Sequence, residues 1–181
     1  MRTKQTAGSF MGRNYLTWLI YGLSAFVIML LQNAPNFFPT IGYARPTPLV
    51  LLVVCIAMFE GPRIGAIIGL ISGLFWDLYS VRVFGFTALQ MLFIGAIVAL
   101  LVQWLLRTNF LSGMLLCVAG VVIQMLIEWF FRYVLYMHDE MLTILVSVYL
   151  PNALYTVCLS PVMYWFILFL ARFLRRHRKT A

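Results

Sequence analysis

An acidic side chain inside an apolar stretch of sequence is costly to bury, so its position is informative. Asp77 stands near the end of such a stretch, between aromatic residues of the kind that gather at a membrane–water boundary. Three roles are open for it. The first is a functional charge, and the second is a solvated carboxylate beside Arg82. The third is a cap, whose oxygens accept hydrogen bonds from backbone N–H groups of the turn that closes at Gly85.

Glu128 is the second acidic residue inside an apolar run. Gln124 precedes it by four residues and Arg132 follows by four, so all three share one side of a helix. The order Glu then Arg favours an ion pair at this spacing, and a neutralised Glu128–Arg132 pair is the simpler interpretation. The alternative is a buried proton or ion site, which is weakened because no second acid or histidine accompanies Glu128.

Residue sets that run a reaction are not found in the sequence. His138 and His177 have no metal-binding partners at a recognised spacing, and no phosphate-binding loop or nucleophile elbow is present. Cys55, Cys117 and Cys158 lie in separate apolar runs, which predicts neither a disulfide framework nor a metal site. We therefore predict that the protein is not an enzyme and has no catalytic residue, no metal and no cofactor.

Glycines recur every four residues through one apolar segment. Four residues advance roughly 400° around a helix, so these glycines form a slowly winding stripe on one side. Small residues in such a stripe let two helix backbones approach closely. Packing within the chain and a groove for a partner's helix are both open. The candidate binding residues are the four glycines of the stripe, Gly61, Gly65, Gly69 and Gly73. Asp77, four residues after the last of them, and Gly85, in the turn that follows, complete the set.

Composition identifies the kind of protein that must position these residues. The chain has 181 residues, of which 64% are hydrophobic and 10% charged, and its mean hydropathy is +0.97. Soluble domains are about 45–50% apolar and about 25% charged. The sequence therefore predicts an all-α integral membrane protein. A crossing takes about 20 residues, which leaves no room here for a soluble catalytic domain.

Apolar runs predict about six transmembrane helices. A break is expected at 60–63, because Pro62 suits the first position of a new helix. The segment before it is short for a crossing and is predicted to thin the bilayer or to be partly unwound. Pro151 and Pro161 predict an interfacial or re-entrant piece at 141–150. The six segments are 15–31, 49–59, 64–79, 86–106, 110–131 and about 152–171.

Basic residues predict the orientation. They gather at both ends, so we expect a cytoplasmic basic arm (1–14), a single transmembrane domain (15–171) and a cytoplasmic basic tail (172–181). With six crossings, ten Lys and Arg lie inside, and only Arg45, Arg82 and Arg132 lie outside. The ends suit anionic lipid headgroups, and no aromatic platform accompanies them to bind nucleic acid.

Three stretches in the middle of the chain form a distinctive pattern. RP followed by PLVLL spans 45–52, Gly61 leads to GLISGLFWDL at 69–78, and GFTAL spans 85–89. Over these roughly 45 residues the chain resembles the rod shape-determining protein MreD family. The ends match only in hydropathy.

The resemblance implies a non-enzymatic scaffold of the bacterial cell-elongation (rod) complex, a multi-pass protein of the cytoplasmic (inner) membrane involved in cell shape and side-wall peptidoglycan synthesis. The implied partners are an MreC-like single-span protein, MreB-like actin filaments, and the rod-system glycosyltransferase and class B transpeptidase. The implied fold is similar to that of the small substrate-binding membrane subunits of vitamin transporters.

That fold similarity supplies an alternative function, a solute-binding membrane subunit that needs an ATPase partner. Such a subunit should direct several polar side chains into one pocket, whereas polar residues on the predicted outer side are few. The glycine stripe instead offers a surface for helices. Fold analogy alone cannot choose between the two functions, and the residues favour the scaffold.

Overall fold

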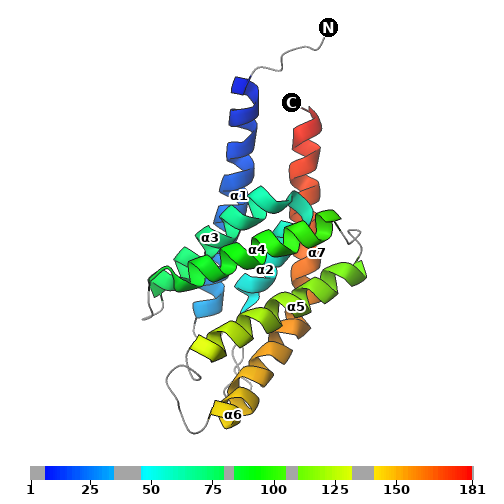
Figure 1. The fold of residues 1–181 in the computed structure, drawn as a ribbon. Coiled ribbons are helices and arrows are strands. Elements are labelled where there is room, and N and C mark those ends of the chain that lie inside the picture. Colours follow the sequence, from blue (N-terminus) through cyan, green and yellow to red (C-terminus); the bar gives the residue numbers. More distant parts are fainter. Residues whose placement is uncertain (1–6, 35–45, 80–83, 105–109, 132–140, 181) are drawn as a thin grey trace.

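The computed structural model describes residues 7–34, 46–79, 84–104, 110–131 and 141–180, and these ranges contain helices and no strand. The helices are α1 (Ala7–Asn33), α2 (Pro48–Glu60), α3 (Pro62–Tyr79), α4 (Phe86–Trp104), α5 (Phe110–Trp129), α6 (Met141–Ile144) and α7 (Leu150–Thr180), and a π-helical segment, η2 (Leu145–Tyr149), precedes α7. α3 and α4 run alongside each other, and the N-terminal end of α1 lies at the same end of the molecule as the C-terminal end of α7 (Figure 1).

α2 is the centre of the molecule. Its residues from Leu49 to Met58 are 0–4% exposed, and α1, α3, α4, α5 and α7 all pack against it. A helix that is apolar on every side is stable only where it is covered on every side. With 13 residues, α2 is about 20 Å long, which is short for a hydrocarbon layer of about 30 Å. Of the two alternatives predicted for this segment, partial unwinding is wrong, because neighbouring helices enclose α2 and it is a regular helix. Local thinning of the bilayer stays a prediction.

The predicted break between α2 and α3 is confirmed. Gly61 has a φ of 90°, a conformation that side chains other than glycine rarely adopt. Its N–H donates to the Ala57 carbonyl at 3.2 Å, which closes α2. Pro62 then begins α3, where a missing N–H costs nothing.

The apolar outer faces of the helices confirm the prediction that the protein is an all-α membrane protein. Among the described residues, three helical stretches are long and apolar enough to cross a membrane: Phe86–Trp104, Phe110–Trp129 and Leu145–Leu174. Thr17–Asn33 in α1 and Pro48–Glu60 are shorter apolar helices. Large apolar side chains on the outer faces are strongly exposed, among them Trp104, Leu111 and Phe169. A water-soluble monomer rarely shows so much exposed apolar surface.

The helical structure of the last third of the chain differs from what the sequence predicted. The helix does not break at the prolines, because α6, η2 and α7 follow one another without interruption. An interfacial position for 141–150 stays a prediction. The N–H of Leu150 donates to the carbonyl of Leu145, five residues back, and this π-type turn changes the hydrogen-bond register just before Pro151. Pro161 lies inside α7. Helix also extends past the predicted crossings at both ends, from Ala7 in α1 and to Thr180 in α7.

Candidate functional site

Three glycines of the stripe form the contact between α3 and α4. A Cβ atom added to Gly65 would lie 2.7 Å from the Ala57 Cβ and 3.1 Å from the Gly95 carbonyl oxygen. One added to Gly69 would meet the Met91 carbonyl group, and one added to Gly73 would lie 2.7 Å from the Ala88 nitrogen. Backbone of α4, together with Ala57 of α2 at Gly65, therefore occupies the space that larger side chains would need. The stripe lies against the chain's own helices.

Gly61 and Gly85 have a different role from the other four positions. A Cβ at either glycine would meet nothing within 4 Å, so neither is needed for close packing. Both have positive φ, 90° and 94°, and they stand immediately before α3 and α4. These two glycines therefore set backbone turns.

Gly95 is a packing residue that the sequence interpretation missed. A Cβ there would contact the Gly65 carbonyl group, so the two glycines face each other across the α3–α4 contact. The signal was present in the sequence, since small residues Ala88, Gly95 and Ala99 follow helical spacing on α4.

Asp77 caps the next helix. Its side chain is 3% exposed, and Oδ2 accepts hydrogen bonds from the N–H groups of Gly85 at 2.9 Å and Ala88 at 3.1 Å. Gly85 immediately precedes α4 and Ala88 lies in its first turn, where N–H groups have no partner within the helix. A carboxylate there also suits the helix dipole. Burial excludes the solvated alternative, and Arg82 lies outside the described residues.

A line of polar side chains joins α4 to α5. Gln90 Nε2 donates to the Gln124 carbonyl oxygen at 3.0 Å, and Gln124 Nε2 donates to Glu128 Oε1 at 3.2 Å. The structure thus brings Gln124 and Glu128 together at their i, i+4 spacing. Arg132 lies outside the described residues, so the Glu128–Arg132 ion pair stays a prediction. Gln90, a polar residue in an apolar run, was not predicted to take part.

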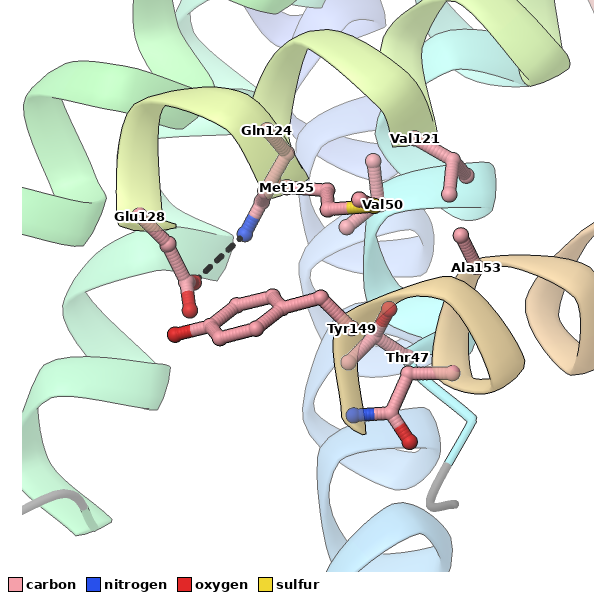
Figure 2. Close-up of a pocket in the computed structure, with 9 residues that line it drawn as sticks. Thr47, Val50, Val121, Gln124, Met125, Glu128, Tyr149 and Ala153 are labelled. Carbon is pink, nitrogen blue, oxygen red and sulfur yellow. Dashed lines mark hydrogen bonds between the residues drawn. The ribbon is translucent and has the colours of Figure 1, made fainter. Parts of the chain in front are cut away.

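Glu128 and Gln124 line a small hollow whose other walls are largely apolar. Its volume is about 60 Å³, and α5, η2, the start of α7 and the residue before α2 surround it. Figure 2 shows the Tyr149 ring extending from η2 toward the Glu128 carboxylate, with Thr47 beside Tyr149. Thr47 is fixed there because its N–H donates to Thr156 Oγ1 of α7 at 3.0 Å. The lining residues are Thr47, Val50, Val121, Gln124, Met125, Glu128, Tyr149, Asn152 and Ala153.

A larger groove of about 820 Å³ lies around the break between α2 and α3, between Trp18 of α1 and the end of α4. Tyr21 donates to Glu60 at 3.1 Å beside it, while the Arg63 side chain on its rim is exposed. Apolar residues such as Met58 and Val102 also line it. Within the described ranges, no cluster of three metal-binding side chains accompanies either hollow.

The fold defines a helical membrane protein whose acidic and glycine residues serve helix packing and capping in the described contacts. A protein-family model described as rod shape-determining protein MreD matches residues 12–174. The chain belongs to the MreD family, and the predicted resemblance is confirmed. Neither the curated proteins nor the solved structures contain a match to the chain. The alternative solute-binding function, which depended on a fold analogy, therefore has no support from these comparisons.

Proposed function

We propose that the protein is a non-enzymatic scaffold of the rod complex in the bacterial inner membrane, involved in side-wall peptidoglycan synthesis. Membership of the MreD family over residues 12–174 is the observation that carries this proposal. Its work would be to hold other membrane proteins in place. The proposed partners are an MreC-like single-span protein, MreB-like filaments, and the rod-system glycosyltransferase and class B transpeptidase.

A scaffold needs a rigid frame, and the α3–α4 contact is suited to be one. Backbones that touch through Gly65, Gly69 and Gly73 leave no flexible side chains between the two helices. The Asp77 carboxylate also bonds the end of α3 to the start of α4. The frame leaves the outer faces of α4, α5 and α7 covered in large apolar side chains, which are available to lipid or to a partner's helix.

The proposed orientation has six crossings with both termini in the cytoplasm. It is supported by the ends of α1 and α7, which lie at the same end of the molecule (Figure 1), and by the excess of basic residues at both ends of the chain. Anionic lipid headgroups would bind these basic ends. The groove around Glu60 and Arg63 then opens toward the cytoplasmic side.

Complementation tests the proposal. In a rod-shaped bacterium depleted of its own MreD, expression of this protein should restore rod shape, and a Gly69→Leu variant should do so less well. Gly22→Leu is the matched control, because a Cβ at Gly22 meets nothing within 4 Å. Round cells despite normal expression and membrane insertion of the wild-type protein would contradict the proposal.

A further inference from the structure

The groove around the break between α2 and α3 combines apolar walls with a polar rim. Its volume of about 820 Å³ far exceeds the ~30 Å³ that one water occupies in the liquid. Trp18, Ile64 and Val102 line the groove and are partly exposed, so apolar surface is open inside it. Arg63 and Gln103 also line it, and their side chains are exposed. A ligand that fills this space therefore needs both an apolar part and a polar part.

The groove lies at the predicted membrane boundary, on the side where the basic ends of the chain are expected. Trp18 stands near the start of the predicted crossing 15–31, and Arg63 immediately precedes the predicted crossing 64–79. Tryptophan gathers at this level of a bilayer, where headgroups meet acyl chains. A lipid can therefore enter the groove from the bilayer while its headgroup stays at its usual depth.

Arg63 is a cation that no described residue neutralises by direct contact. Its guanidinium has neither an ion pair nor a hydrogen bond with the part of the chain that the structure describes. Glu60, the one acidic residue in the described lining, instead accepts a hydrogen bond from Tyr21 of α1 at 3.1 Å. The planar donors of an arginine fit phosphate oxygens and form charge-assisted hydrogen bonds with them. Gln103 adds an amide donor on the same rim.

We propose that this groove binds one anionic phospholipid, with its phosphate on Arg63 and an acyl chain along the apolar wall. Basic hollows between membrane helices on the cytoplasmic side bind anionic headgroups. A zwitterionic headgroup suits the site less well, because its own cation would lie near Arg63. A partner's helix, about 10–12 Å across with its side chains, is wide for this groove, whereas an acyl chain is narrow. The basic tail differs from this site, since it attracts anionic headgroups without selecting one molecule.

Native mass spectrometry of the delipidated full-length protein in detergent tests the site. Phosphatidylglycerol should be retained as one bound molecule, and phosphatidylcholine with the same acyl chains should bind about tenfold more weakly. Glycerol phosphate, which has the charge but no acyl chain, should not be retained at the same concentration. Equal retention of the two lipids, or retention of glycerol phosphate as strong as that of phosphatidylglycerol, would overturn the proposal.

Matched variants tie the lipid to the groove. Arg63→Gln removes the cation and should weaken retention of phosphatidylglycerol about tenfold. Arg172→Gln is the control, because it removes an exposed cation of α7 that does not line the groove, and it should retain the lipid. Both substitutions are at exposed positions, so both proteins should fold. An equal effect of the two substitutions would mean that basic surface attracts lipid without a defined site, and would overturn the proposal.

Photo-cross-linking in intact membranes identifies the occupant. Benzoylphenylalanine in place of Gln103 should yield protein that carries a covalently attached anionic phospholipid, and Arg63→Gln should reduce that adduct. The control position is Leu101, which is exposed on α4 but does not line the groove. Lipid captured there should show no enrichment of anionic headgroups and no response to Arg63→Gln. Capture of a partner protein in place of lipid at position 103, or the same lipid composition at both positions, would overturn the proposal.

Discussion

At the residue scale, the acidic and glycine residues hold helices together through their contacts. Asp77 is the clearest case, since a side chain near the end of α3 satisfies N–H groups at the start of α4. This role was one of three that the sequence left open. Local sequence could not choose among them, because the choice depends on whether the fold buries the carboxylate.

Substitutions at Asp77 separate capping from charge. Asp77→Ala leaves the N–H groups of Gly85 and Ala88 without their acceptor and should cost about 1–3 kcal/mol. Asp77→Asn keeps an accepting oxygen but loses the charge at the helix terminus, so it should cost less, about 0.3–1 kcal/mol. Thermal unfolding in detergent measures both. An alanine variant as stable as the wild type would show that the cap does not stabilise the fold.

A substitution at Gly69 tests most directly whether close packing of the glycine stripe against α4 stabilises the protein. A side chain there would meet the Met91 backbone, and the backbone of α4 cannot move aside as a flexible side chain can. Gly69→Leu should therefore destabilise the protein by about 1–3 kcal/mol. Gly22→Leu, in open space on α1, should change stability far less. Equal loss in the two variants would mean that leucine harms any helix of this protein and that the close contact is unimportant.

At the element scale, some boundaries follow from local chemistry and others do not. The break at Gly61 and Pro62 was predictable because a positive φ and a missing N–H are properties of those residues alone. The burial of α2 on all sides was not predictable, because it depends on five neighbouring helices. Pro151 was expected to interrupt its helix, but the π-helical segment η2 leads into α7 without a break.

The identity of the helix that covers the glycine stripe was also beyond the sequence. A stripe on α3 shows that some backbone approaches closely, but any of the other helices would meet that condition. Only the fold shows that α4 does so, with Gly95 opposite Gly65.

The packing of α2 against α5 makes a testable element-scale prediction. The Cys55 and Cys117 sulfur atoms lie 3.7 Å apart in the buried core, while Cys158 is exposed on α7. A small membrane-permeant oxidant should therefore form an intramolecular Cys55–Cys117 disulfide in a Cys158→Ser variant. Mass spectrometry after denaturing alkylation counts the thiols that remain. Two alkylated thiols after prolonged oxidation would contradict the α2–α5 contact.

At the scale of the whole molecule, orientation is the first question. Reporter fusions after Ala181 and within 33–44 should place the C-terminus in the cytoplasm and that loop outside, as the positive-inside rule requires for six crossings. An extracytoplasmic C-terminus would contradict the proposed orientation and would turn the groove around Glu60 and Arg63 to the outer side.

The central claim is that this protein acts by binding other membrane proteins of the rod complex. Affinity purification from cross-linked membranes, with quantitative mass spectrometry, tests it most directly. The wild-type protein should recover an MreC-like single-span protein as a leading partner, and Gly69→Leu should recover less of it than Gly22→Leu at equal expression. Recovery of an ATP-binding cassette module in place of rod-complex proteins would contradict the scaffold and favour a solute-binding subunit.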